Sequence, residues 1–286
     1  MSAVVLALVS AFLFGGMSVG LKLGLARHAD VALATLATIA GALAVTLVAA
    51  VAEAPTRGVH ASAAWPFALT GLIQPGVGQL LVTLAIREAG ASRASMVFGA
   101  APLVSVTIAL VLLGEPARVS LLAGAVLIVA GGVELARERD RPRHVRSIGL
   151  VYAFVVTVLF AARDNLLRWL LQGSNVPPAV AAAATALGAA LVLAALLVPR
   201  IESWPRLRET APFLGVGALF GSSYVALFEA YYRGRVTVVS PLVATESLWA
   251  VGLSLLLMRR TELVGRWLVF GAVLIVAGGA LIGAFR

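Results

Sequence analysis

A nine-residue sequence, GAVLIVAGG, occurs twice in this chain, at residues 124–132 and again at residues 271–279. The two copies lie 147 positions apart, which is about half of the 286 residues. Glu115 and Glu262 lie at the same offset. Repetition at a fixed interval predicts that a chain contains two copies of one structural unit, so the fold must be one that can be built twice.

Other segments support the same division. FGGMSVGLKLGL in the first half aligns with FAARDNLLRWLL in the second, and this alignment pairs Lys22 with Arg168 at an offset of 146. The most polar stretch, RERDRPRHVR, divides the chain almost equally. The sequence therefore predicts a first repeat at 1–136, a basic linker at 137–147 and a second repeat at 148–286.

The composition indicates an integral membrane protein. Apolar residues make up 61% of the sequence and charged residues 12%, whereas soluble domains contain about 45–50% apolar and about 25% charged residues. The first 25 residues are apolar but lack the basic region and A-x-A cleavage site of a signal peptide, so we expect a membrane span there. The absence of cysteine excludes disulfides, thiol nucleophiles and thiolate metal sites.

Ten runs of about 20 mostly apolar residues, the length of a membrane-spanning helix, are separated by charges or by clusters of Pro and Gly. They predict an all-α integral membrane protein with ten transmembrane helices. The predicted spans cover about residues 3–25, 30–52, 65–86, 92–113, 118–136, 148–172, 178–198, 211–232, 236–258 and 264–284.

Five spans in each half is an odd number, so the second half must enter the membrane in the opposite orientation to the first. The sequence thus predicts two five-helix inverted-topology repeats. Transporters of this design alternate access to a site near the bilayer midplane, where the two repeats meet.

Two motifs carry a resemblance to a known family. Pro102 is followed by a hydrophobic run to Gly114 and Glu115 and then by a span that ends in GAVLIVAGG; the second half repeats this pattern through Leu255–Met258, Glu262 and the second nonapeptide. The chain thus resembles the drug/metabolite transporter superfamily, in particular its ten-span EamA-type exporters.

The resemblance implies secondary transport, usually export, of small metabolites or drugs by a multi-pass protein of the bacterial inner membrane. It leaves the substrate open, because the superfamily carries amino acids, nucleotide sugars, triose phosphates and toxic cations. The second half departs from the pattern near its ninth span. Thr261 replaces the Gly before Glu262, and Trp249 stands where the first half has Pro102.

Charged side chains within membrane spans are energetically unfavourable and normally face a cavity or a partner, so each is a functional candidate. Six stand out within the predicted spans: Lys22, Arg163, Asp164, Arg168, Glu229 and Glu246. Asp164 and Arg168 are four residues apart and can pair on one helix face, with Arg163 about 100° away. The pair would bind a polar substrate or release Asp164 for proton exchange. Alternatively, it would fix helix packing, with Arg168 and Lys22 reaching toward the interface.

Two glutamates are further candidates for proton coupling. Glu246 lies about ten residues into the ninth span, near the bilayer centre. Removal from water disfavours the charged form of a carboxylate, which would suit a proton-coupled step; alternatively, a hydrogen-bonded glutamate would hold spans together. Glu229 lies nearer the end of the eighth span, so an interfacial position is the alternative for it.

Aromatic and amide side chains are also candidates for substrate binding. Tyr224, Phe228 and Tyr231 share a helix face, and Trp249 lies one turn after Glu246, an arrangement that would suit a cation or an aromatic group. Interfacial belts, above all for Tyr231 and its neighbour Tyr232, and ordinary packing are the alternatives.

Gln74 and Gln79 flank a break at Pro75 and Gly76 in the third span. Broken helices often border transport sites, although a structural kink would account for the same pattern. Small residues at intervals of four predict close helix packing; they are Gly16, Gly20 and Gly24 in the first span and Gly279 and Gly283 in the tenth. Glu115 and Glu262 are expected to favour the positive ends of the helices that follow them.

His28, His60 and His144 show no metal-ligand spacing, and the chain contains no phosphate-binding loop or catalytic triad motif. We therefore expect no cofactor, no metal, no enzymatic activity and no ATP-driven pumping. The mixture of acidic and basic candidates favours a secondary transporter of a zwitterion such as an amino acid. Translocation of lipids by a flippase or scramblase is the main alternative, and a passive channel is a further one.

The expected partners are a small-molecule substrate, membrane lipids and protons, and not nucleic acid, since the net charge of +9 is spread over loops that can contact lipid headgroups. Either a monomer or a homodimer through the small-residue face of the tenth span would fit. The orientation stays open. The positive-inside rule places both termini outside, whereas the family resemblance suggests that they lie inside.

Overall fold

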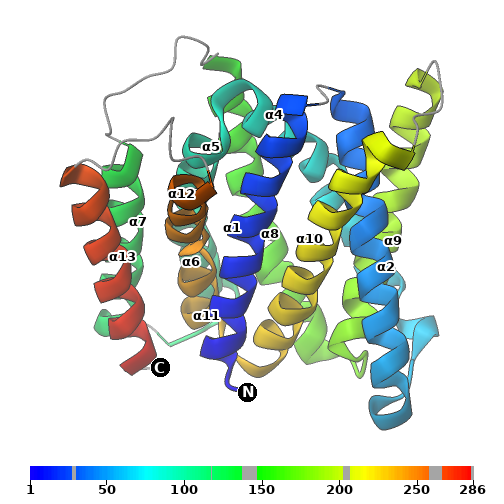
Figure 1. The fold of residues 1–286 in the computed structure, drawn as a ribbon. Helices are drawn as coiled ribbons and strands as arrows, with labels where there is room; N and C mark the ends of the chain where they lie inside the picture. The colour runs from blue at the N-terminus through cyan, green and yellow to red at the C-terminus, as the bar shows by residue number, and fades with distance from the viewer. Residues whose placement is uncertain (28–29, 117, 137–146, 202–206, 258–265, 285–286) are drawn as a thin grey trace.

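The computed structural model describes residues 1–27, 30–116, 118–136, 147–201, 207–257 and 266–284, and within these residues the chain is helical, without β-strands (Figure 1). The first half contains α1 (Ala3–Arg27), α2 (Val31–Arg57), η1 (Ala61–Ala63), α3 (Trp65–Gly71), the π-helical turn η2 (Leu72–Val77), α4 (Gly78–Ala89), α5 (Ala91–Phe98), α6 (Ala101–Leu112) and α7 (Val119–Ala136). The second half contains α8 (Ser147–Gly173), α9 (Pro178–Leu197), η3 (Val198–Arg200), α10 (Leu207–Arg233), α11 (Val236–Val243), α12 (Glu246–Leu257) and α13 (Arg266–Ala284).

Seven helical segments of the described residues are long and apolar enough to cross a membrane. They are Ala3–Arg27, Val31–Arg57, Trp65–Ala89, Ser147–Gly173, Pro178–Leu197, Arg208–Arg233 and Val236–Leu257. Large apolar side chains such as Val48, Val51 and Val151 point outward from them, a surface that is stable in lipid. The predicted multi-pass membrane protein is thereby confirmed, and the count of ten spans remains a prediction.

The two copies of GAVLIVAGG pack against each other. They lie on α7 and α13, which form one edge of the bundle (Figure 1, left). A Cβ atom placed on Gly131 would lie 2.5 Å from the carbonyl oxygen of Gly271, and one on Gly278 would lie 2.5 Å from that of Gly124. Because the residue numbers run in opposite directions along this contact, the two copies are antiparallel, as an inverted repeat requires.

A second set of helix contacts repeats in the same way. In one place α2 packs on α10, and in the other α9 packs on α3. In both, a glycine of each helix faces a backbone carbonyl of its partner, which lets the backbones approach closely. The four contacts are Gly41 to Leu214, Gly217 to Thr38, Gly188 to Ala68 and Gly71 to Thr185. Equivalent residues lie 146 or 147 positions apart, so one interface occurs twice.

The predicted packing of small residues is confirmed for the first span and shifted for the tenth. Gly20 and Gly24 of α1 face Val216 and Phe213 of α10, and Gly16 also contacts this helix. In α13 the tight contact is made by Gly278, whereas its neighbour Gly279 has only ordinary contact with Leu242. The surroundings of Gly283 lie outside the part of the chain that the structure describes. The face of α13 that holds Gly278 is therefore covered by α7 of the same chain.

Carboxylates cap two helix N-termini at the end of the bundle that holds the chain's N-terminus (Figure 1, bottom). Glu115 accepts hydrogen bonds from the backbone N–H groups of Val236 and Thr237, both at 2.9 Å, and so caps α11. Glu53 accepts one from Ala179 at 2.9 Å and caps α9. The expectation that Glu115 serves the helix that follows it was wrong, because α6 packs along α11 and brings its end to the start of that helix. Glu262 lies outside the described residues.

Gly131→Ala is expected to lower the melting temperature of the purified protein. Its methyl group would meet the Gly271 carbonyl, and overpacking of this kind costs about 1–3 kcal/mol. Gly132→Ala is the matched control, because no atom lies within 4 Å of its Cβ position. Thermal unfolding in detergent distinguishes the two; equal melting temperatures would contradict the α7–α13 contact.

Candidate functional site

Two equivalent helices are broken at the centre of the molecule. The helix of the fourth predicted span stops at Phe98 and restarts at Ala101, and that of the ninth stops at Val243 and restarts at Glu246. The breaks lie 145 positions apart, whereas the two nonapeptides lie 147 positions apart. At the breaks, Glu246 therefore corresponds to Ala101. The pairing of Trp249 with Pro102 was therefore wrong by two residues. Discontinuous helices in corresponding positions of two repeats commonly mark transport sites.

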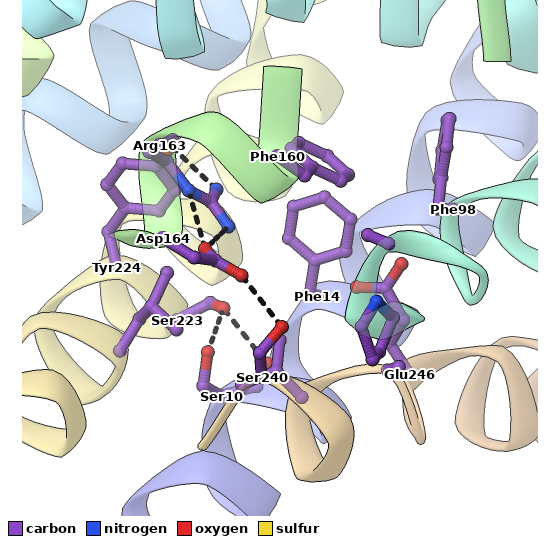
Figure 2. A pocket seen from close by; sticks show the side chains of 15 residues that line it. Ser10, Phe14, Phe98, Phe160, Arg163, Asp164, Ser223, Tyr224, Ser240 and Glu246 are labelled. Atoms are coloured by element: carbon purple, nitrogen blue, oxygen red, sulfur yellow. Dashed lines mark hydrogen bonds and ion pairs between the residues drawn. The ribbon is translucent and has the colours of Figure 1, made fainter. Parts of the chain in front are cut away.

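A pocket lies between the breaks (Figure 2). Helices of both halves contribute to its walls. The lining residues are Ser10 and Phe14 of α1, Phe98, Ala101 and Pro102 of α5 and α6, Phe160, Arg163 and Asp164 of α8, Ser223, Tyr224 and Leu227 of α10, and Ser240, Val243, Ala244 and Glu246 at the second break. The pocket thus lies at the interface between the repeats.

An ion pair forms one wall of the pocket. The Nη2 and Nε atoms of Arg163 donate to Asp164 Oδ1 at 2.7 and 3.1 Å, and its Nη1 donates to the hydroxyl of Tyr224 at 3.2 Å. Asp164 Oδ2 accepts a hydrogen bond from Ser240 at 2.9 Å. Both charged residues are buried, and the hydrogen bonds compensate each charge in a site that excludes most water.

The predicted pair of Asp164 with Arg168 is replaced by the pair with Arg163. Arg163 has a long side chain that folds back to its neighbour, beneath the rings of Phe160 and Tyr224. Arg168 lies one turn further along α8. Its Nη1 donates to the backbone carbonyls of Tyr231 and Tyr232 at 2.7 and 3.2 Å, which belong to the last turn of α10, where carbonyls lack helical partners.

Glu246 differs from Asp164 in its surroundings. It is buried, with 5% of its surface exposed, and its carboxylate faces the pocket between the rings of Phe14 and Phe98 (Figure 2). Within the described part of the chain, its carboxylate makes no hydrogen bond or ion pair of the kind that satisfies Asp164. As the first residue of α12, Glu246 also lies at the positive end of that helix.

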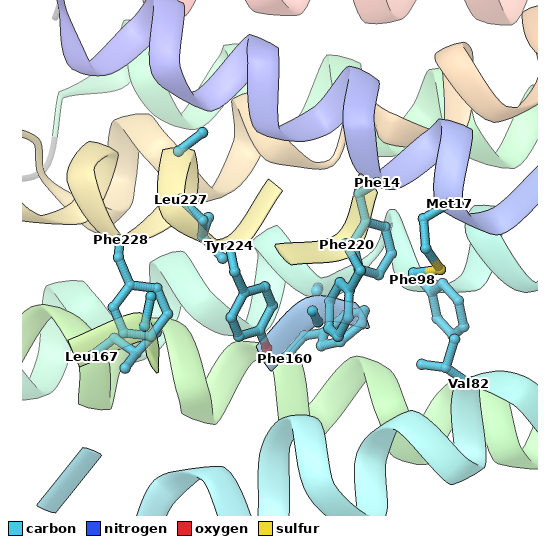
Figure 3. Close-up of a cluster of buried hydrophobic side chains, with 14 of the residues drawn as sticks. Phe14, Met17, Val82, Phe98, Phe160, Leu167, Phe220, Tyr224, Leu227 and Phe228 are labelled. Atoms are coloured by element: carbon cyan, nitrogen blue, oxygen red, sulfur yellow. The ribbon is translucent and has the colours of Figure 1, made fainter. Parts of the chain in front are cut away.

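A continuous row of aromatic rings runs along the pocket (Figure 3). Successive ring centroids lie 4.6 to 5.8 Å apart in the order Phe98, Phe160, Phe14, Phe220, Tyr224 and Phe228. Sequence reasoning found Tyr224 and overlooked Phe14, Phe98 and Phe160. A signal was present, because Phe14 and Phe160 begin the two aligned segments of α1 and α8 and meet edge to face at 5.8 Å.

Other predicted aromatic and amide residues lie outside the pocket. Trp249 is partly exposed on the outer side of α12 and meets Phe12 edge to face. Tyr231 is fully buried, so its placement in an interfacial belt was wrong, whereas Tyr232 is exposed beneath Arg57.

The break in the third span lies behind the pocket. Gln74 has non-helical backbone angles (φ −138°, ψ 111°) within η2 and interacts with Tyr224, one of the lining residues. Gln79 is buried one turn further along, in α4. Neither side chain lines the pocket, and Gln74 contacts Tyr224 from outside the site.

Two predicted charged residues lie nearer the ends of the helices. Glu229 binds Arg57 through two hydrogen bonds of 3.0 and 3.1 Å and also pairs with Arg233, four residues later on α10. Arg57 in turn pairs with Glu53. Lys22 belongs to the last two turns of α1 and is not among the lining residues. The structure thus brings together Arg163, Asp164, Tyr224 and Glu246 of the predicted site.

Two matching helical halves with a charged pocket at paired helix breaks form an architecture that is typical of membrane transporters. The model of the EamA-like transporter family matches residues 1–134 and 147–284. The chain therefore belongs to this family and is a membrane transporter of small molecules.

A solved crystal structure shows the same fold. It aligns at a TM-score of 0.76 and 22% sequence identity and covers 99% of this chain and 97% of its own. No curated protein matches the sequence.

Asp164→Asn is expected to lower the melting temperature strongly. It leaves the Arg163 guanidinium buried without its counter-ion, and removal of one partner from a buried pair costs about 3–5 kcal/mol. The double variant Arg163→Gln/Asp164→Asn should recover most of this loss. Glu246→Gln, which removes a carboxyl group from the same pocket without isolating a charge, is the control. Additive losses in the double variant would contradict the pairing.

Proposed function

We propose that the chain is a secondary transporter that crosses the membrane ten times and exports small amphipathic metabolites, such as amino acids or related compounds, by alternating access. The observation that carries this proposal is the pair of equivalent helix breaks, because a helix of each half is interrupted beside the same pocket. In this proposal α5 and α6 together form the fourth span, and α11 and α12 together form the ninth; each of these spans is interrupted. Helices α7 and α13 are the fifth and tenth spans.

Polar contacts support a closed pathway at one end. We name Glu53, Arg57, Glu229 and Arg233 the terminal network; it joins α2 of the first half to α10 of the second. The cap of Glu115 on α11 lies at the same end and also joins the halves. Ion pairs near a surface contribute about 0–1 kcal/mol each, so the network can hold this end shut and still open on a functional timescale.

The site suits a substrate with a charged group and an apolar body. Its walls combine the Arg163–Asp164 pair and Glu246 with the rings of Phe14 and Phe98. Ligand sites of this kind are mostly apolar, with a few polar groups that fix orientation. A lipid translocator would instead need a groove open to the bilayer, so a dependence of flux on lipid headgroups is the outcome that would favour the alternative.

Ala244→Trp is expected to abolish transport. Ala244 is a small residue of the pocket wall, and an indole group there would fill the pocket. The measurement is counterflow of labelled amino acids into proteoliposomes, with saturation as the mark of a carrier. Leu256→Trp, on an exposed position of α12, is the control and should retain flux. Equal flux in both variants would place the pathway elsewhere.

Glu229→Gln is expected to speed opening at the terminal network. The chain contains no cysteine, so Thr237→Cys introduces a single buried thiol between Ser240 of the pocket and the start of α11. Loss of two pairs, each worth up to about 1 kcal/mol, should raise its rate of labelling by a methanethiosulfonate up to about thirtyfold. Glu88→Gln, which removes an ion pair within α4, should leave the rate unchanged. An unchanged rate in Glu229→Gln would show that the network does not close this end.

A further inference from the structure

The charges of the pocket are unequally satisfied. Both oxygens of Asp164 are engaged, one by Arg163 and the other by Ser240. Arg163 is held by Asp164 and by Tyr224, beneath two aromatic rings. These groups form a closed set whose members already have their partners, so a ligand that bound to either charge would first have to displace its partner.

Glu246 is the exception. The residue is buried, with 5% of its surface exposed, it lines the pocket, and its carboxylate lacks a hydrogen-bonding partner within the described residues. A buried carboxylate without a partner is unstable in its charged form. In a folded carrier this oxygen pair therefore holds either a proton or a positively charged group supplied by the ligand.

The walls beside Glu246 also favour a cation. Phe14 of α1 and Phe98 of α5 flank the carboxylate (Figure 2), and the faces of aromatic rings attract cations. Phe160 and Tyr224 already do so for Arg163, at 4.8 and 5.6 Å from the ring centroids. Phe14 and Phe98 are thus the rings of the pocket that remain for the cationic group of a ligand.

We propose that Glu246 is the binding site for the ammonium group of the substrate and that the substrate class is an amine with an apolar or aromatic body. This inference rests on the proposed function and deepens it. Because the Arg163 guanidinium is already paired, the substrate's own carboxylate is not required for binding, and simple monoamines bind as well as amino acids do.

The same carboxylate couples binding to protons. Glu246 holds one proton or one ammonium group, and binding of a cation releases the proton, so that charge is conserved in the site. The charged groups that face Glu246 are Arg163 and Asp164 of α8, which neutralise each other. The helices packed against α12 present Phe14 from α1 and Phe98 from α5. Exchange of one proton for one monocation follows.

The test uses four ligands with one phenyl body: phenethylamine, phenylalanine, 3-phenylpropionate and phenethyl alcohol. Thermal shift and calorimetry on the purified full chain give binding. We expect phenethylamine and phenylalanine to bind and the acid and the alcohol not to bind. Phenethylamine affinity should fall up to tenfold for each pH unit below the range in which Glu246 ionises, and binding in weak buffer should release up to one proton.

Glu246→Gln should lose phenethylamine binding at least tenfold and lose the pH dependence, whereas Glu88→Gln should retain both. If Glu246→Gln does not fold, proton release on binding to the wild-type chain still tests the proposal. Binding of phenylalanine without phenethylamine, binding that survives Glu246→Gln, or amine binding without proton release would each overturn the proposal. Counterflow of any amino acid in those cases would leave the proposed transport function standing.

Discussion

The interior of a lipid bilayer offers no hydrogen-bond partner to a peptide group, and this constraint shapes the whole molecule. Backbone groups must be satisfied within the chain, so the described residues form helices, and any break in a helix must be enclosed by protein. Both central breaks, at residues 99–100 and 244–245, meet this condition because they face each other across the pocket. The place where the backbone is least regular is thus also the place where a polar ligand can be held.

The scaffold is nearly symmetric, and the chemistry of the pocket is not. Helix contacts through glycine recur at equivalent positions in both halves, and Phe14 and Phe160 meet as counterparts near the centre. At the restart of the broken helix, however, one half has Ala101 and the other has Glu246. In the proposed mechanism a symmetric frame moves between two states related by its pseudo-two-fold axis, and the single carboxylate of Glu246 selects what it carries.

The sequence was informative about elements that depend on long apolar runs. The helical ranges follow from hydropathy and the close packing of α1 from glycine spacing, and the division into two halves was predicted from the repeated nonapeptide. The two central helix breaks were not predicted, since two residues hardly change the hydropathy of a span. The pair of Arg163 with Asp164 was also missed, because helical spacing favours partners three or four residues apart and a long, flexible side chain can defeat that rule.

The ion pairs of the molecule differ in how easily contacts with water can replace them. The Arg163–Asp164 pair is buried, and separating it would expose two charges to a medium of low polarity, so it moves as a unit. The terminal network lies at the helix ends, where water can replace each partner at little cost in free energy. A conformational change that opens one end and closes the other would break the second set and preserve the first. A group bound at Glu246 can bias that conformational change only if it stabilises one state more than the other. The rings of Phe14 and Phe98 come from two different helices, and contacts with these rings are the proposed source of that difference.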